Sequence, residues 1–545
     1  MSATDKPGFV AARREQALAE HLRRAASAPD DDELLLQAWA DATDAEWLAL
    51  IQRLMLERDG CTWSVLQHAM QRHPRSTALR QAHASLLLQR GDARAAEEQL
   101  RALLAEPSAR PASSFALARL LKDQGRMHAV ADVLHGAFGT PGGDLEQRIQ
   151  AIELLDDCGR KRDAADLAEV EIGAGSADPR LHAYAGMLQA QLGRFDVARE
   201  RYAFVAANST QAPDWHVPQG LAGLQRYADA GHPDFALFRR YLASPLNDDA
   251  RTSLLFALGK AHDDIGEYAQ AAHFLRDANA RAAARAHWSR KRWARSIEVR
   301  RKRRLPAVTL EPEPGWTPVF IVGVPRSGTT LVARQLSGHA LVCHRGESPW
   351  LPALAERIDG TGGGDYRQRL EDAAATYAAQ LRQDDAPAAR WFVDKQPRNF
   401  LHVDLILSLF PNARIIQCQR RARDIALSLW MQSFHDRSLD FSCDFADIAA
   451  YIRGARQLMT GWQARYPHAV RTIRYEELAA DPAACLAGLA QWLGLPRSPA
   501  ASTDHDHAIS TASLWQARQP VHTRSVDRWR HYAPFLPELL QIARD

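Results

Sequence analysis

Glycine recurs at a fixed spacing in the first half of the chain, and this spacing constrains the fold more than any other feature. Each glycine stands between two segments whose apolar residues have helical spacing. A glycine at such a point lets the chain turn after one helix and begin another. The sequence therefore predicts stacked helical hairpins that bury each other's apolar faces. Four of these glycines follow one another at intervals of 34 residues: Gly91, Gly125, Gly159 and Gly193.

A small residue stands five positions after each glycine, where it permits close packing of the second helix. Looser copies of the pattern surround Gly231 and Gly266, and Gly60 marks a degenerate leading copy. The period, and the Gly-x-aromatic-x-x-Ala core at 193–198 and 266–271, resemble the tetratricopeptide repeat (TPR). That resemblance implies an α-solenoid with a concave surface for a peptide or protein; an array that only supports or dimerises the second domain is an equal alternative. The small residues are Ala96, Val130, Ala164, Ala198, Ala236 and Ala271.

The second half opens on the run VFIVGVPRSGTTL, residues 319–331. An apolar segment leads into a tight Gly/Pro/Ser turn, and helix-forming residues follow. This order predicts a strand, a loop and a helix whose N-terminus faces the loop. Backbone N–H groups in such a loop can surround an anionic group, and the helix dipole favours negative charge there. The run therefore predicts a phosphate cradle.

The cradle differs from the loop of nucleotide hydrolases at one position. Its glycines keep the hydrolase spacing, but Thr329 stands where those enzymes need a lysine, and the positive charge lies inside the turn at Arg326. A loop of this kind resembles the 5′-phosphosulfate loop of sulfotransferases, which bind 3′-phosphoadenosine-5′-phosphosulfate (PAPS). The resemblance implies that the following residues contact the cofactor: Pro325, Arg326, Ser327, Gly328, Thr329 and Thr330.

Short β-rich runs alternate with helical ones after residue 318. The runs are WFVDK at 391–395, ARIIQCQR at 413–420 and VRTIRYEEL at 470–478. This alternation is typical of βαβ units and of a parallel sheet with helices on both faces. Ligands of such sheets bind at the carboxyl ends of the strands. We therefore expect an N-terminal TPR-like α-solenoid followed by a P-loop-like α/β sulfotransferase domain.

Arg420 and Ser428 resemble the 3′-phosphate motif of sulfotransferases, in which an arginine at a strand end and a serine eight residues later grip the ribose 3′-phosphate. An arginine fork suits a phosphate dianion, and a helix-borne hydroxyl adds a second donor. Arg421 and Ala422 replace the pair that usually follows this arginine. Arg421 or Arg423 could therefore share the contact, and that alternative stays open.

Sulfonate transfer to a hydroxyl needs a base and a positive charge near the leaving phosphate. Resemblance to tyrosylprotein sulfotransferase and to bacterial TPR-containing enzymes implies that Glu347, which follows Arg326 by 21 residues, is the base. The segment that begins at Asp394 resembles the family's Asp-Lys-x-Pro-x-Asn-Phe run, in which Lys395 would approach the sulfonate. Arg326 is the third candidate catalytic residue. Rival bases with less support are His339, His344 and His402.

The segment 511–529 resembles the family's closing segment over the nucleotide. It implies cofactor contacts from Ser513 and Arg528. Tyr475, after the last predicted strand, is a candidate neighbour of the adenine, although a core tyrosine is an equal interpretation.

A basic stretch, residues 285–304, holds ten Arg/Lys and one acid. Trp288 and Trp293 interrupt it, which invites a nucleic-acid interpretation. The favoured interpretation is a connecting helix whose apolar residues, with Ile297, cover the last repeat while the arginines face water. No nucleic-acid partner is therefore expected. We predict three regions: repeats at 1–284, a basic helix and Pro-rich linker at 285–316, and the sulfotransferase domain at 317–545.

Composition limits the remaining choices. The chain of 545 residues has a net charge of +3 and six scattered cysteines without zinc-ligand spacing, so no metal is expected. Without a secretory h-region or a long apolar run, a cytoplasmic protein without a membrane span is the default expectation.

The expected activity is PAPS-dependent transfer to a hydroxyl, with protein-tyrosine sulfotransferase activity as one candidate. The acceptor, whether peptide, sugar or small phenol, and a homodimeric state stay open. Two alternatives remain: a TPR adaptor with an inactive nucleotide-binding domain, and a divergent P-loop kinase or ATPase.

Overall fold

The chain divides into two compact units. The first contains residues 1–123 and 129–140, and the second contains 124–128 and 141–545. The computed structural model describes residues 7–24, 32–57, 59–306, 308–359, 365–434, 436–496 and 521–543.

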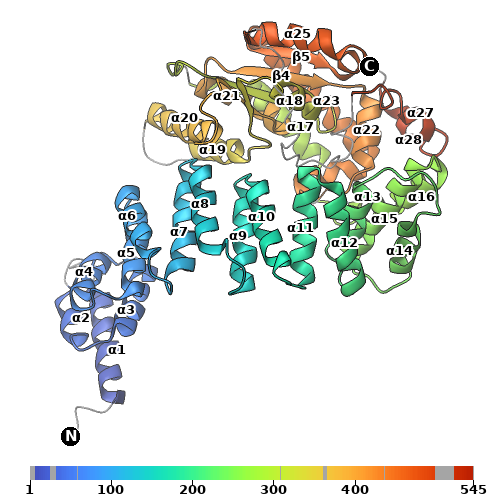
Figure 1. Ribbon diagram of the computed structural model, residues 1–545. Helices are drawn as coiled ribbons and strands as arrows, with labels where there is room; N and C mark the ends of the chain where they lie inside the picture. The colour runs from blue at the N-terminus through green and yellow to red at the C-terminus, as the bar shows by residue number, and fades with distance from the viewer. Residues whose placement is uncertain are drawn as a thin grey trace. The chain divides into compact units, whose positions relative to one another are not determined.

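The first unit is helical in its described residues (Figure 1). Trp47, Ile51 and Leu54 from one helix are fully buried, and they pack with residues of the next two helices in one apolar cluster. The helices are α1 (Pro7–Arg24), α2 (Glu33–Ala38), α3 (Asp44–Glu57), α4 (Thr62–Arg72), α5 (Thr77–Gln89), α6 (Ala93–Leu103) and α7 (Arg110–Asp123), with α8 (Met127–Phe138) at the division between the units.

The second unit begins with further helices of the array. Neighbouring helices pair as hairpins, most closely α11 with α12 and α15 with α16. The bounds are α9 (Leu145–Asp157), α10 (Lys161–Gly173), α11 (Pro179–Leu192), α12 (Phe195–Asn208), α13 (Val217–Gly223), α14 (Pro233–Leu242), α15 (Asp248–Asp264) and α16 (Tyr268–Ala283).

The periodic glycines occupy the turns of these hairpins, as the sequence predicts. Gly193 ends α11 in the left-handed region at φ +82°, a conformation that glycine adopts without a Cβ penalty. The packing residues Ala96, Val130, Ala164, Ala198 and Ala271 are fully buried. The other periodic glycines with positive φ are Gly91, Gly125, Gly159 and Gly266.

The copy around Gly231 departs from the pattern. Ala236, predicted as its packing residue, is exposed, and Phe235 is buried instead. The prediction for Ala236 is therefore wrong. The helix before this glycine, α13, has only seven residues, and α14 begins at Pro233 immediately after the turn. Gly231 also lacks the positive φ of the regular copies, so the chain enters α14 through a different turn.

The basic stretch forms α17 (Arg290–Lys302). Its apolar side packs against α23, not only against the last repeat as expected. Trp293 stacks on Tyr451 at 4.4 Å between ring centroids, and its Nε1 donates to the carbonyl of Ala450 at 3.2 Å. Gly454 allows this close approach, because a Cβ there would lie 2.5 Å from the same indole nitrogen.

A parallel sheet forms the core of the C-terminal α/β half. Its order is β2-β3-β1-β4-β5, with β1 at the centre between β3 and β4. β1 is buried along its length after Thr317, as expected for a strand covered on both faces. The strands are β1 (Thr317–Gly323), β2 (Val342–His344), β3 (Trp391–Asp394), β4 (Arg414–Gln419) and β5 (Val470–Arg474).

Helices pack on both sides of this sheet. One apolar cluster contains Phe320 and Ile415, and a second contains Val319 and Ile416, so alternate residues of a strand feed opposite layers. The elements are α18 (Thr329–Ser337), α19 (Trp350–Asp359), α20 (Tyr366–Arg382), η2 (Pro397–His402), α21 (Val403–Leu409), α22 (Ala422–Trp430), η3 (Arg437–Cys443), α23 (Phe445–Arg465), α24 (Tyr475–Ala480), α25 (Pro482–Leu493), α27 (Trp529–Tyr532) and α28 (Glu538–Gln541).

Asp263 on α15 joins the last repeats to the C-terminal segment within the second unit. Its carboxylate accepts from Tyr532 Oη at 2.6 Å and forms an ion pair with Arg528. Asn279 on α16 adds a hydrogen bond of 2.9 Å to the carbonyl of Trp430. The fold is thus a helical array followed by a parallel α/β domain. Among the helices of the described ranges, none combines the length and apolarity needed to cross a bilayer.

Candidate functional site

The loop after β1 is held in a conformation that only small residues allow at two points. Gly328 has φ +100°, and a Cβ there would lie 2.7 Å from Cδ2 of Tyr475. At Gly323, a Cβ would lie 2.6 Å from the carbonyl oxygen of Cys418 on β4. Any larger residue at either position would collide with a neighbouring strand end, so both positions require glycine. Helix α18 begins directly after Gly328.

Arg326 lies within this loop in the left-handed region at φ +74°. A non-glycine residue there is uncommon and strained, and such strain gathers at functional sites. Its Nε donates to Ser428 Oγ at 3.0 Å, and its carbonyl accepts from Arg420 Nη1 at 3.1 Å. Burial, together with the neighbouring charge of Arg420, lowers the pKa of Arg326 to about 10.

Arg420 extends from the end of β4 toward the same loop. Its Nη2 donates to the carbonyl of Ser525 at 2.7 Å, and its guanidinium carbon lies 4.5 Å from the ring centroid of Tyr475. Burial also lowers the pKa of Arg420. Within the described ranges, no carboxylate lies within ion-pair distance of Arg326 or Arg420. Two half-buried guanidinium groups thus adjoin each other without a counter-ion.

Two polar atoms beside this pair lack a partner. Ser327 Oγ and Arg420 Nε are buried and make no hydrogen bond in the structure. Buried donors without partners are unfavourable, and an anionic ligand would satisfy them. The donor set, with the cradle glycines, fits a phosphate or sulfate group. Five predicted cofactor residues therefore meet here: Arg326, Ser327, Arg420, Ser428 and Tyr475.

A second group of predicted site residues, Lys395 and Glu347, lies at the end of β3. Lys395 Nζ forms an ion pair with Glu347 Oε1, and the backbone N–H of Lys395 donates to the carbonyl of Gly346 at 2.9 Å. The Lys395 side chain is 3% exposed, whereas that of Glu347 is 37% exposed. The Glu347 carboxylate is therefore accessible to solvent, while the Lys395 side chain that pairs with it is buried. Because β1, β3 and β4 are parallel neighbours, these two residues share one sheet edge with the cradle.

Asp394 organises this second group, and the sequence analysis assigned it no role. The carboxylate is completely buried and accepts from Ser348 N at 3.3 Å, from Asn399 Nδ2 at 2.9 Å and from Tyr377 Oη. Burial raises the pKa of Asp394 to about 7, against the effect of the tyrosine hydrogen bond. Asp394 is thus tied to both members of the ion pair: Lys395 follows it in sequence, and Ser348, which donates to it, follows Glu347.

The other residues predicted to contact the cofactor lie outside the two groups described above. Pro325 and Thr329 are buried, and Thr330 is half-buried in the first turn of α18. Arg528 is engaged by Asp263 of the array. Ser513 lies outside the described residues.

Arg421 and Arg423 turn toward the C-terminal segment. Arg421 forms an ion pair of 2.7 Å with Asp527. Arg423 donates to the carbonyls of Ile542 and Leu540 at 3.1 and 2.9 Å. Both side chains are thus occupied in positioning the end of the chain.

Two of the three histidines considered as rival bases lie against other groups of the protein. His339 Nε2 lies 3.0 Å from the carbonyl of Pro496. Burial, with nearby Arg300 and Arg303, lowers the pKa of His402 to about 4. His402 is therefore neutral near pH 7. His344 lies at the end of β2.

A group of possible metal ligands lies in the first unit. Side-chain atoms of His21, Asp59 and Cys61 are within 4.8 Å of one another. His21 Nε2 is 3.0 Å from Asp59 Oδ2, and both side chains are 2% exposed. Asp59 also caps the N–H of Cys61 at 2.9 Å, so hydrogen bonds alone account for this arrangement.

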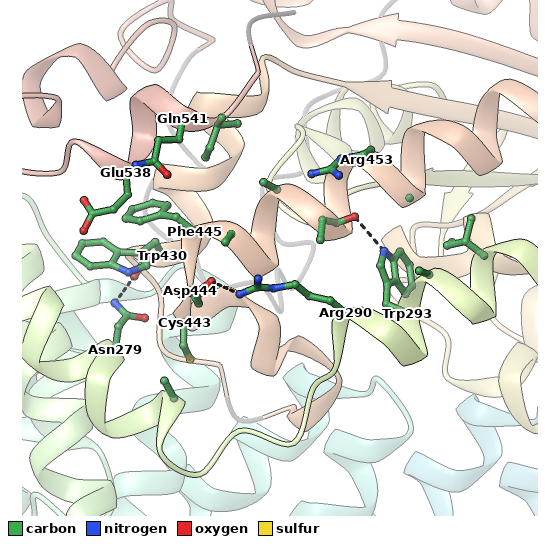
Figure 2. Close-up of a pocket in the computed structure, with 18 of the residues that line it drawn as sticks. Asn279, Arg290, Trp293, Trp430, Cys443, Asp444, Phe445, Arg453, Glu538 and Gln541 are labelled. Atoms are coloured by element: carbon green, nitrogen blue, oxygen red, sulfur yellow. Dashed lines mark hydrogen bonds and ion pairs between the residues drawn. The ribbon is translucent and has the colours of Figure 1, made fainter.

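A cavity of about 940 Å³ is lined by none of the predicted site residues. Figure 2 shows residues of its lining. Trp293 and Arg290 from α17 face Phe445 and Arg453 from α23 across it. Arg290 pairs with Asp444 and Asp447 at the cavity wall.

Comparison with known proteins finds a family that part of this chain resembles. Residues 318–499 match the model described as the sulfotransferase family. This part of the chain, about a third of its length, is therefore similar to the sulfotransferase family.

Two further proteins have sequences similar to parts of this chain. An uncharacterized protein of Aquifex aeolicus is 28% identical over 317 residues, which cover 54% of this chain and 42% of that protein. Protein-tyrosine sulfotransferase 2 of Gallus gallus is 23% identical over 249 residues, which cover 41% of this chain and 67% of the relative. This chain thus spans less than half the length of the first relative.

Solved structures with similarity to this chain include two bacterial sulfotransferase domains. The domain from the Synechococcus PCC 7002 olefin synthase is 20% identical, covers 44% of this chain and 96% of its own, and has a TM-score of 0.32. The domain from the curacin biosynthetic pathway is 19% identical, covers 43% and 97%, and has a TM-score of 0.30.

Proposed function

We propose that this protein transfers a sulfonate group from PAPS to an acceptor hydroxyl. The observation that carries the proposal is the pair Arg326 and Arg420, two adjoining guanidinium groups that lack a counter-ion among the described residues. Like charges in a half-buried place are unfavourable unless an anion neutralises them. A ligand with phosphate groups at two positions satisfies both.

The cofactor would lie along the sheet edge. The loop N–H groups and Arg326 hold the 5′-phosphosulfate, while Arg420 and Ser428 hold the 3′-phosphate. In the structure Ser428 Oγ accepts from Arg326 Nε, so its own proton is available for a ligand oxygen. Tyr475, already stacked beneath Arg420, offers a ring face near the nucleotide.

The chemistry follows from Glu347 and Lys395. PAPS supplies an activated sulfonate. Glu347, the exposed partner of the ion pair, accepts the proton of the acceptor hydroxyl. Lys395 and Arg326 place positive charge where the leaving phosphate gains negative charge, and no metal ion is needed for that role. The buried network around Asp394 keeps the base and the lysine together.

The acceptor class is proposed as a hydroxyl on a peptide or protein. The similarity to protein-tyrosine sulfotransferase 2 supports a tyrosine, and the helical array supports a polypeptide. Sugars and small phenols are the competing acceptors.

Calorimetry with adenosine 3′,5′-bisphosphate tests the cofactor assignment. We expect binding without magnesium, unchanged by EDTA. Arg420→Gln should weaken it by about tenfold or more, because a charge-assisted bond to phosphate contributes roughly 1.5–3 kcal/mol. Arg421→Gln is the matched control, because the Arg421 side chain pairs with Asp527 instead of joining the arginine pair, and this variant should bind as wild type.

The same experiment separates the rival functions. Magnesium-dependent heat from an ATP analogue, with none from the bisphosphate, would indicate a kinase or ATPase and reject the proposal. No heat from either nucleotide would indicate an adaptor with an inactive domain.

A further inference from the structure

The cavity whose lining Figure 2 shows lies in the second unit, apart from the proposed transfer site. Helices α16, α17 and α23 form its long walls, and the end of α22 and helix α28 complete the lining. Its volume of about 940 Å³ falls within the range of roughly 300–1,000 Å³ that is usual for small-molecule pockets. We call this space the interhelical cavity.

Alanine methyl groups from all three long walls face the interhelical cavity. Ala280 and Ala283 lie on α16, Ala294 lies on α17 and Ala446 lies on α23, and all four are exposed. Larger apolar residues at these positions would fill the space between the helices. The alanines instead leave an apolar slot, which suits a flat, narrow molecule. Because an empty groove could look the same, the polar groups at its two ends decide what it binds.

Asn279 on α16 places an unsatisfied acceptor at one end of the slot. Its side chain is buried, and its Nδ2 donates to the carbonyls of Leu275 and Trp430 at 2.8 and 2.9 Å. Two carbonyl partners identify this atom as the amide nitrogen, so the other atom is the oxygen. That oxygen, Oδ1, makes no hydrogen bond, and Figure 2 shows it turned away from Trp430 toward the middle of the cavity. A buried acceptor without a partner is unfavourable, and a donor on a bound molecule would satisfy it.

Arg453 on α23 provides a positive charge at the other end of the slot. The other two arginines of the lining are paired, Arg276 with Glu538 and Arg290 with Asp444. Arg453 is exposed, and it has no ion-pair partner among the residues that the structure describes. An anionic group at this end would therefore meet an available guanidinium.

Helix α23 sets the distance between the two ends. Trp430, whose carbonyl holds Asn279, stacks on Phe445 at 5.0 Å between ring centroids. Phe445 begins α23, and Arg453 lies on the same helix, two turns further along. These two turns rise about 12 Å, at about 1.5 Å per residue. A molecule that reaches both ends therefore needs a body of about this length.

We propose that the interhelical cavity binds an elongated, flat aromatic carboxylate that carries an N–H or O–H donor at its far end. The donor bonds to Asn279 Oδ1, the aromatic body lies between the alanines, and the carboxylate meets Arg453. This site goes beyond the proposed transfer reaction and does not depend on it. It adjoins α22, the helix that carries Ser428, but none of the predicted site residues lines it.

Isothermal titration calorimetry on the full-length protein, without nucleotide, tests the proposal. The probe is 4′-carbamoylbiphenyl-4-carboxylic acid, which has a carboxamide donor and a carboxylate at opposite ends and no hydroxyl that could accept a sulfonate. Two comparison compounds each lack one end: biphenyl-4-carboxylic acid lacks the donor, and biphenyl-4-carboxamide lacks the charge. We expect the loss of the donor to weaken binding by about two- to tenfold, which is the usual contribution of one hydrogen bond between neutral groups.

Two variants test the protein side of the contact. Arg453→Gln should weaken binding of the charged probe by about three- to fivefold, the upper range for an exposed ion pair, and should leave binding of the neutral carboxamide unchanged. Ala446→Leu should abolish binding of both, because the larger side chain occupies the slot. The matched controls are Arg239→Gln and Ala236→Leu, at exposed positions of α14 outside the lining of the cavity, and both should bind as wild type.

Four results would overturn the inference. They are no binding of the charged probe to wild type, equal affinity of the carboxylates with and without the carboxamide, equal effects of Arg453→Gln on the charged and neutral probes, and full binding by Ala446→Leu. The last result would mean that the compound binds elsewhere on the protein. Differential scanning fluorimetry checks that each variant is folded, as expected for substitutions at exposed positions.

Discussion

Tyr377→Phe removes one hydroxyl from the most deeply buried polar network of the α/β domain. Tyr377 is completely buried, its ring stacks on Phe320 at 5.8 Å, and its hydroxyl donates to the fully buried Asp394. Phenylalanine keeps the ring and its packing. The change therefore isolates one hydrogen bond to a carboxylate in a place that water does not reach.

The size of the expected loss of stability depends on the hydrogen bonds that Asp394 keeps in the variant. Its Oδ2 keeps the bond from Asn399, and its Oδ1 keeps the longer bond from Ser348. Losing a hydrogen bond to a charged group lowers the free energy of unfolding by about 1.5–3 kcal/mol. If the α/β domain melts as one unit, its midpoint should fall by about 3–6 °C.

Tyr451→Phe is the control. Tyr451 is 3% exposed and stacks on Phe441 at 3.8 Å, but its buried hydroxyl has no hydrogen-bond partner. Removing that hydroxyl should leave the midpoint unchanged or raise it slightly. Differential scanning fluorimetry and urea unfolding measure both variants. An unchanged midpoint in Tyr377→Phe, or equal losses in the two variants, would refute the assigned role of Asp394.

Two further predictions concern pH and the cradle. Because burial raises the pKa of Asp394 to about 7, the folded state binds its proton more tightly than the unfolded state, and the free energy of unfolding should fall as pH rises from about 4 to 7. Urea titrations from pH 5 to 8 should show a weaker fall in Asp394→Asn; an identical slope would contradict this. Gly328→Ala should weaken bisphosphate binding by about tenfold or more in calorimetry, because its Cβ would displace Tyr475 from beneath Arg420. Gly91→Ala is the control, since φ is +82° there but no atom lies within 4 Å, and equal binding by both variants would refute the role of the clash.

Local patterns predict the elements of this fold well. The glycine period is sufficient for the hairpins, because a turn residue and the helices beside it are close in sequence. Strand-loop-helix order likewise predicts the parallel sheet and the cradle at the end of β1. The copy around Gly231 shows the limit, since the buried residue there is Phe235 rather than Ala236. The turn at Gly231 lacks the left-handed glycine of the regular copies, and a glycine in the sequence does not reveal which conformation it adopts.

Contacts between distant segments could not be predicted from these patterns. Trp293 was expected to cover the last repeat, but its stacking partner Tyr451 lies on α23, more than 150 residues later. Asp394 was visible within a motif, yet its partner Tyr377 is a tyrosine on α20 without any local signal. Arg528 was assigned to the cofactor by resemblance, and its ion pair with Asp263 depends on how two segments fold together.

The carboxylate of Asp263 has a practical consequence for anyone who wishes to divide this polypeptide. A fragment that starts at residue 317 would contain Arg528 and Tyr532 but not the acceptor that satisfies both. The Arg528 guanidinium and the Tyr532 hydroxyl would then lose the buried carboxylate that they share. Both groups help to surround Arg420 at the end of β4. The boundary that looks natural in the primary structure is therefore a poor place to cut.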